Sequence, residues 1–256
     1  MKVPVPRISL PGEDALVASW RALAELSPGA DVISSPVAVA AVFPHWSVLN
    51  NAIALDVDGE AVVAGVASEL SNLYGEAGID TWALWIPSDA RDLDAADSVA
   101  AVGTLKRDTT TLVMHADLGD DLQSNPDVVR TSVDPTSVVG DEPVAATDLP
   151  DADFGRGIEG WALAHEGVAV AGAWSCIHGD DCGIYAVGTA PERRRRGFGR
   201  ALVEHVLADA RCRGAKTTTL QSTGMGQGLY ESLGYVASGR YEEWVSRPDS
   251  VEGLKL

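Results

Sequence analysis

Four consecutive arginines and two glycines form the run with the clearest chemical potential, Arg193-Arg194-Arg195-Arg196-Gly197-Phe198-Gly199-Arg200. It lies between a strand-like stretch, 184–188, and a stretch of helical periodicity, 201–210, so its glycines are expected at a helix N-terminus. The first turn of a helix leaves N–H groups without internal partners, and their dipoles attract anions. Glycine lets the backbone approach a pyrophosphate closely, and arginines add fork-shaped donors. The sequence therefore predicts a diphosphate site.

The spacing excludes two common phosphate motifs. A nucleotide P-loop needs two glycines five apart followed by Lys and Ser or Thr, and a dinucleotide fingerprint needs three glycines. The alternative, a solvated charge cluster, is disfavoured because each arginine at a helix N-terminus opposes the dipole at a cost of about 0.3–1 kcal/mol. A bound anion offsets that cost.

Two ordered motifs resemble those of a known family. Arg194-x-x-Gly197-x-Gly199 resembles the Arg/Gln-x-x-Gly-x-Gly/Ala signature of the GNAT superfamily of acetyl-coenzyme A-dependent N-acetyltransferases, and 187–191 resembles the strand that precedes it. The segment 229–235 resembles the later Leu-Tyr-x-x-x-Gly-Phe motif. The resemblance covers about 158–245 and implies an α/β (α+β) GNAT fold, a mixed central sheet flanked by helices. It also implies transfer of acetyl from acetyl-coenzyme A to a primary amine by direct attack in a ternary complex.

The same resemblance implies which residues bind the cofactor. Backbone groups of Val187 and Thr189 are expected to bind the pantetheine arm. The residues expected at the pyrophosphate are Arg194, Arg195, Arg196, Gly197, Phe198, Gly199 and Arg200. Thr223 is expected near the cofactor too, although Thr223 and Gly226 stand where the family usually carries Asn and Ala.

Tyr230 is the predicted proton donor to the departing thiolate. A tyrosine of pKa about 10 is protonated at neutral pH and can donate to a thiolate whose conjugate acid has a pKa of about 8.5. The alternative is an aromatic that fills the space between helix and sheet. The candidates for a general base are Glu166, His178, Asp180 and Glu243, and a chain of water molecules is a further alternative.

Composition limits the partners of this 256-residue chain. The formal net charge is −18, yet 11 of its 19 Lys and Arg lie in 181–256. An acidic body with a local basic patch repels nucleic acid and still holds a compact phosphorylated cofactor. The acidity could attract a cationic amine acceptor, but solubility or adaptation to salt is the favoured explanation. A small molecule or a peptide could supply the amine, and an oligomer is possible but not indicated.

The remaining composition favours a cytoplasmic protein. There is neither an apolar stretch of about twenty residues nor a secretion leader, so we expect no membrane association. The three cysteines lack Cys-x-x-Cys spacing, and no metal site is expected.

Two domains are expected, 1–125 and 126–256, because the segment 120–150 is rich in Asp, Pro, Ser and Thr. In the first, helices are predicted at 14–26 and 37–43, strands at 51–56 and 61–67 around the turn Asp58-Gly59, a strand at 81–86, a helix at 92–101 and an extended segment at 109–118. In the second, strands are predicted at 160–165, 168–177 and up to Val187, then a helix, a strand at 217–221, a helix and a last strand at 235–245.

The first domain's order resembles a degenerate GNAT-like copy without the arginine and glycine loop; an unrelated α/β cap is the alternative. Neither should bind coenzyme A. Trp46, Asn50 and Trp174 are candidate acceptor contacts where the two halves meet, with core packing and turn capping as the alternatives. A non-catalytic sensor of acyl-coenzyme A, or a partner-docking module, is the alternative function.

Overall fold

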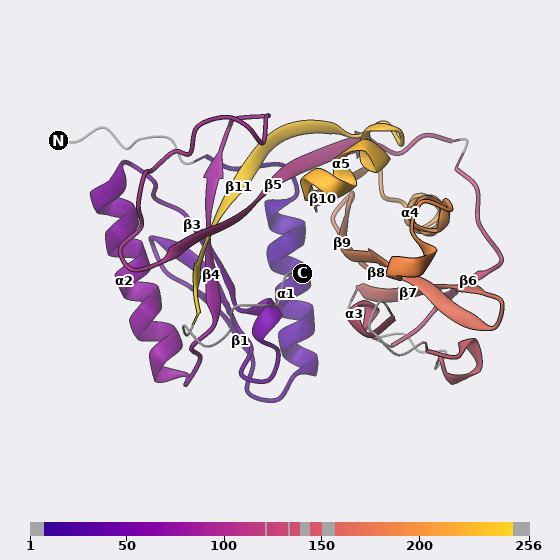
Figure 1. Ribbon diagram of the computed structural model, residues 1–256, viewed down its shortest axis with the longest axis horizontal. Helices are drawn as coiled ribbons and strands as arrows, with labels where there is room; N and C mark the ends of the chain where they lie inside the picture. The colour runs from indigo at the N-terminus through magenta and orange to yellow at the C-terminus, as the bar shows by residue number, and fades with distance from the viewer. Residues whose placement is uncertain (1–7, 121, 133, 139–143, 150–156, 248–256) are drawn as a thin grey trace.

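The computed structural model describes residues 8–120, 122–132, 134–138, 144–149 and 157–247. The strands form one sheet, and helices flank it (Figure 1). The elements of the first half (1–125) are α1 (Glu13–Leu26), β1 (Asp31–Ser34), β2 (Ala38–Val42), β3 (Asn51–Ala54), α2 (Glu60–Glu76), β4 (Trp82–Ser88) and β5 (Lys106–Asp117). Those of the second half (126–256) are β6 (Val128–Arg130), α3 (Pro135–Val138), β7 (Ile158–His165), β8 (Val168–His178), β9 (Asp181–Thr189), α4 (Phe198–Cys212), β10 (Thr217–Ser222), α5 (Gly224–Glu231) and β11 (Val236–Ser246).

Within the described residues, the sheet is mixed and has eleven strands, in the order β1-β2-β3-β4-β11-β5-β10-β9-β8-β7-β6. Two neighbouring pairs are parallel, β3 with β4 and β9 with β10. The buried side chains of α2, α4 and α5 pack on one face, and those of α1 pack on the other. The predicted fold class, a mixed central sheet flanked by helices, is confirmed.

The two halves exchange strands at the centre of this sheet. β11, the last strand of the described residues, is antiparallel to both β4 and β5, so that Tyr241 lies opposite Pro87 on one side and Thr111 on the other. β5 in turn lies between β11 and β10, with Leu112 opposite Ser222. Figure 1 shows β5 and β11 running side by side from one part of the molecule to the other. Each half therefore completes the sheet of the other.

The halves also repeat one order of elements. Three antiparallel strands, a helix and a parallel strand occur as β1, β2, β3, α2 and β4, and again as β7, β8, β9, α4 and β10. The second half then continues through α5 to β11, whereas the first reaches β5 through an irregular segment, 89–105. The repeat agrees with the prediction of tandem halves.

Three predicted elements of the first half are wrong. The strand predicted at 61–67 is the start of α2, where buried Val63, Val66, Leu70 and Tyr74 recur at helical spacing. The helix predicted at 37–43 is strand β2, because its backbone pairs with strands on both sides. The helix predicted at 92–101 is irregular, since carbonyls of this segment accept hydrogen bonds from the side chain of Arg240 instead.

Helix α1 joins the two halves. Its buried side chains Leu16, Trp20 and Leu23 belong to an apolar cluster that includes Phe43 of the first half and Trp174 of the second. Each such side chain contributes about 1.5–3 kcal/mol through burial. Figure 1 shows α1 between the two parts of the bent sheet, where it contacts β1, β2, β8 and β9.

None of the helices in the described residues combines the length and apolarity needed to cross a membrane. The same part of the chain holds no group of three His, Cys, Asp or Glu side chains placed to bind a metal ion.

Candidate active site

The arginine and glycine loop joins the end of β9 to the start of α4. A short 3-10 turn, Pro191–Arg193, leaves β9, and Gly197 precedes the first residue of α4. Arg195 and Gly197 both adopt left-handed backbone angles, with φ of 64° and 86°. Glycine tolerates this conformation, whereas an arginine there carries strain. The backbone therefore changes direction at these two residues, immediately before α4 begins.

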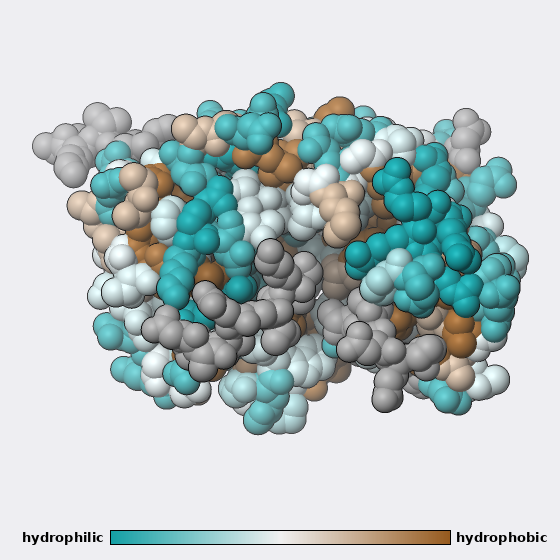
Figure 2. All heavy atoms as spheres, in the orientation of Figure 1, coloured by the Kyte–Doolittle hydropathy of each residue, from teal (hydrophilic) through white to brown (hydrophobic). Residues whose placement is uncertain are grey.

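The amides of this loop are available to a ligand. Among the described residues, the six backbone N–H groups of 195–200 donate no hydrogen bond to a protein acceptor. By contrast, the amides of Arg193 and Arg194 donate to the carbonyls of Ala190 and Pro191. The loop is exposed, and hydrophilic side chains gather over α4 (Figure 2). Six consecutive N–H groups without a protein acceptor among the described residues, at the positive end of a fifteen-residue helix, have the chemistry to bind an anion.

Four of the five arginines of this run divide into two groups, and the fifth, Arg193, pairs with Glu166. Arg194 donates from Nε to the Thr189 carbonyl at 3.1 Å, and Arg200 donates to Glu204 at 2.9 Å and to the Ser232 hydroxyl at 2.9 Å. For Arg195 and Arg196, no side-chain hydrogen bond or ion pair is found within the described part of the chain. The second group is therefore free to meet a phosphate.

Strand β9 separates from β10 beside this loop. Their parallel pairing runs from Asp181 opposite Thr217 to Ile184 opposite Leu220 and goes no further. A bulge follows at Ala186, whose φ is 51°. Val187 and Thr189, the predicted pantetheine contacts, lie beyond this point, so the edge of β9 that faced β10 is left unpaired there.

Gly199 brings α4 close to β9. A Cβ at this position would lie 3.1 Å from the Thr189 hydroxyl oxygen, tighter than an ordinary contact. The glycine therefore permits the close packing of the helix start on the strand end. It places the free amides and the unpaired edge of β9 next to each other.

Tyr230 lies on α5 in the core beneath this region. Its side chain is buried, and its ring packs edge-on against Tyr235 with centroids 5.7 Å apart. Burial raises the pKa of Tyr230 to about 12, so the phenol keeps its proton at neutral pH. Gly226 makes room for this ring, because a Cβ there would lie 3.0 Å from Tyr230 Cε2 and 3.1 Å from Ser222 Oγ. This explains the glycine at a position where alanine was expected.

The base candidates differ in environment. Arg193 hydrogen-bonds Glu166 at 2.8 Å and lowers its pKa, which weakens it as a base. Asp180 pairs with Lys216 at 3.3 Å on the surface, and His178 lines a groove of about 400 Å³ beside α1. Burial raises the pKa of Glu243. No hydrogen bond or ion pair links any of these four side chains to Tyr230 within the described residues.

Two of the three predicted acceptor residues come together. Trp46, from the loop after β2, stacks on Trp174 of β8 with ring centroids 6.0 Å apart and planes within 11°. The contact joins the two halves. Asn50 lies elsewhere in its loop, where its side chain accepts from the Phe43 amide at 2.7 Å and donates to the Phe43 carbonyl at 3.2 Å. Asn50 therefore closes a turn, and we leave it out of the proposed acceptor site.

The corresponding helix start in the first half has the opposite charge. Asp56 and Asp58 precede Gly59, and α2 begins at Glu60, whose carboxylate accepts a hydrogen bond from the Ala100 amide at 3.0 Å. Carboxylates stabilise a helix N-terminus, and they repel a diphosphate. The first half is therefore still expected not to bind coenzyme A.

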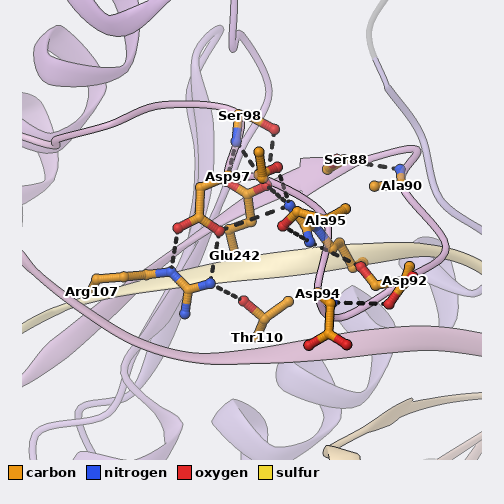
Figure 3. Close-up of polar contacts among 12 residues, drawn as sticks. Ser88, Ala90, Asp92, Asp94, Ala95, Asp97, Ser98, Arg107, Thr110 and Glu242 are labelled. Carbon is orange, nitrogen blue, oxygen red and sulfur yellow. Dashed lines mark hydrogen bonds and ion pairs between the residues drawn. The ribbon is translucent and has the colours of Figure 1, made fainter.

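The loop 89–98 of the first half, predicted in part as a helix, is held by two buried side chains of β11. Arg240 of β11, fully buried, donates to the carbonyls of Asp92, Ala95 and Ala96 at 2.6–2.9 Å and pairs with Glu242 at 2.8 Å. Glu242 accepts from the amide and hydroxyl of Ser98 (Figure 3). The Asp-rich composition of this loop suggests a cationic partner, but nothing in the sequence indicates that the partner is Arg240, far along the chain.

Comparison with known proteins identifies the second half. Residues 157–237 match the acetyltransferase (GNAT) domain model. A search of curated proteins gives no match. Among solved structures, a GCN5-related N-acetyltransferase from Kribbella flavida is similar, with a TM-score of 0.60 and 16% identity over 94% of this chain and 98% of that one.

Two further structures are similar over most of their lengths. A putative acetyltransferase of the GNAT family from Novosphingobium aromaticivorans has a TM-score of 0.55 and 17% identity over 90% of this chain and 95% of its own. A tandem GNAT protein from the clavulanic acid biosynthesis pathway has a TM-score of 0.52 and 13% identity over 95% and 98%. At such identities the likeness shows the fold alone.

The chain therefore has a GNAT fold and carries a GNAT acetyltransferase domain in its second half. The prediction made from the motifs at 194–199 and 229–235 is confirmed. The family and the fold support acyl transfer.

Proposed function

We propose that the protein transfers an acetyl group from acetyl-coenzyme A to a primary amine of a small molecule or peptide. The single observation that carries the proposal is the row of free amides at 195–200, at the N-terminus of α4 and beside the unpaired edge of β9. A linear cofactor fits these two features, with its diphosphate at the free amides and its amide-rich arm along the unpaired edge of β9.

The residues present fit this cofactor. The amides of 195–200 and the side chains of Arg195 and Arg196 hold the diphosphate, and backbone groups at Val187 and Thr189 hold the pantetheine arm. Thr223, exposed at the end of β10, remains a predicted contact. When bound, acetyl-coenzyme A supplies the activated acetyl group as a thioester.

Tyr230 donates a proton to the sulfur that leaves. Its pKa of about 12 lies about 3.5 units above that of a thiol, so complete transfer from the phenol costs about 5 kcal/mol if the thiol keeps its ordinary pKa. The phenol therefore acts first as a hydrogen-bond donor that stabilises the developing charge, and the proton moves as that charge grows. Direct attack by the amine in a ternary complex requires no covalent enzyme intermediate.

The acceptor is proposed to bind near the Trp46–Trp174 stack, where both halves contribute. Trp46→Ala should raise the KM for the acceptor much more than the KM for acetyl-coenzyme A. Equal changes in both constants would assign the stack to folding instead.

Binding and turnover test the proposal separately. We expect coenzyme A to raise the Tm of the full chain, and acetyl-coenzyme A to release thiol when a panel of primary amines is added. The double variant Arg195→Ala/Arg196→Ala should weaken coenzyme A binding about tenfold or more, since two charge-assisted contacts are lost. Arg211→Ala, in the last turn of the same helix, is the matched control and should bind normally. Stabilisation without thiol release across the panel would favour the sensor.

A further inference from the structure

Helix α5, which carries Tyr230, is weak by its own sequence. It has eight residues, three of them glycines at positions 224, 226 and 228, and its N-cap Thr223 makes no side-chain capping hydrogen bond. Each glycine disfavours the helical state about fivefold relative to alanine, and a helix this short is not stable alone. The position of Tyr230 therefore depends on contacts from outside α5.

The C-terminal end of α5 is held from within the second half. Arg200 donates from α4 to the hydroxyl of Ser232, which caps α5 and donates in turn to the Leu229 carbonyl at 2.6 Å.

The N-terminal end of α5 is held by the first half. Leu93 Cδ1 lies 3.3 Å from the place where a Cβ of Gly224 would stand, and the Leu93 side chain packs against the apolar cluster that contains Tyr230. The same cluster includes Leu112 and Met114 of β5, the strand that the first half inserts beside β10.

The backbone of Leu93 is itself fixed. The carbonyls of Asp92 and Ala95, on either side of Leu93, accept hydrogen bonds from Arg240. At the far end of the same loop, the Glu242 carboxylate accepts hydrogen bonds from Ser98 (Figure 3). Both ions are fully buried on β11. A side chain on an exposed irregular loop is thus anchored from both sides against the first turn of α5.

We propose that the first half acts as a positioning domain for the reaction, with Leu93 as the positioning residue that holds α5 and hence Tyr230. This inference rests on the proposed role of Tyr230. The proposal gives a role in the reaction to the first half, which carries acidic residues at the start of α2 where the second half carries the arginine and glycine loop.

The test combines a weakened contact with a compensating change in the full-length protein. Leu93→Ala should speed amide hydrogen exchange in α5 about tenfold and lower kcat with an amine from the panel by a similar factor. The Kd for coenzyme A should change much less than kcat, because the diphosphate loop at 195–200 leads into α4 and Thr223 is the one predicted cofactor contact at α5. Adding Gly228→Ala should restore both α5 protection and kcat, since a Cβ there meets nothing within 4 Å and raises helix propensity about fivefold.

Two controls separate positioning from general stability. Leu73→Ala removes a leucine of similar burial on α2, and Gly65→Ala adds the same propensity to α2, where a Cβ also meets nothing within 4 Å. We expect normal α5 exchange in Leu73→Ala and no rescue of Leu93→Ala by Gly65→Ala. Unchanged α5 exchange in Leu93→Ala, or rescue by Gly65→Ala, would overturn the inference. Full turnover in Tyr230→Phe with faster α5 exchange in Leu93→Ala would instead remove the proposed role of Tyr230.

Discussion

Replacing Arg240 with methionine should destabilise the protein by about 3 kcal/mol, at the lower end of the cost of breaking a buried ion pair. Arg240 and Glu242 are both fully buried and 2.8 Å apart, so the variant leaves the Glu242 carboxylate in the interior without its cation. Two features reduce the cost. Glu242 keeps its hydrogen bonds from Ser98, and the variant also removes the Arg240 Nε, a buried donor without a partner among the described atoms.

The loop carbonyls that lose Arg240 contribute less, because most of loop 89–98 is exposed and water can replace the guanidinium there. The cost should therefore come mainly from the unpaired carboxylate. If so, adding Glu242→Gln to Arg240→Met recovers about 1.5–3 kcal/mol, since the amide is neutral and its oxygen still accepts from Ser98.

Urea unfolding followed by tryptophan fluorescence measures these differences. With a slope of about 3 kcal/mol per molar urea, Arg240→Met should shift the midpoint by about 1 M. Arg107→Met is the control, because Arg107 pairs with Asp97 at 2.7 Å on the surface and should cost less than about 1 kcal/mol. A cost below about 1 kcal/mol for Arg240→Met, or a double variant no more stable than the single one, would refute the reasoning.

Three further predictions concern the proposed site. Tyr230→Phe should lower kcat about a hundredfold with little change in coenzyme A affinity, measured by steady-state kinetics and calorimetry, because the phenol is the proton donor. The pKa of Tyr230 is about 12 in the folded protein and about 10 in the unfolded chain. The contribution of the neutral phenol to folding stability is therefore full below pH 10 and is lost as the pH rises towards 12, because the unfolded chain releases its proton first. Between about pH 10 and 12, the Tm of the wild type should fall more than the Tm of Tyr230→Phe. The fragment 126–256 should give neither a cooperative unfolding transition nor stabilisation by coenzyme A, because β10 and β11 lose the strand that lies between them. A folded, coenzyme A-binding fragment would contradict this last expectation.

The part of the fold that was predictable from sequence is local. The loop at 193–200 and helix α4 carry their signals within twenty residues: glycines at a helix start, then an apolar stripe of Leu202, Val203, Val206 and Leu207. The hairpin of β7 and β8 is similar, since Glu166 and Gly167 adopt the left-handed angles that its tight turn needs. Short-range chemistry decided these elements, and tertiary structure did not override it.

The elements that failed depend on distant partners. The apolar stretch 61–67 has no strand neighbour and becomes helical, whereas 38–42 is enclosed by two strands and extends. Loop 89–98 is irregular because its anchors, Arg240 and Glu242, lie about 145 residues further along the chain. The exchange of β5 and β11 also joins segments more than one hundred residues apart. No pattern within either strand specifies its neighbour, so the sequence predicted two halves but not their shared centre.

Because the two halves share the centre of the sheet, the second half depends on the first for its structure. If the halves were joined only by a linker, the first, with acidic residues at its α2 start, could be lost without effect on the second. Instead, β5 lies between β10 and β11, and Leu93 rests on the first turn of α5. Substitutions in the first half that loosen the contacts of Leu93 or β5 with the Tyr230 cluster should therefore reach the chemistry through the position of Tyr230. They should lower kcat before they weaken cofactor binding.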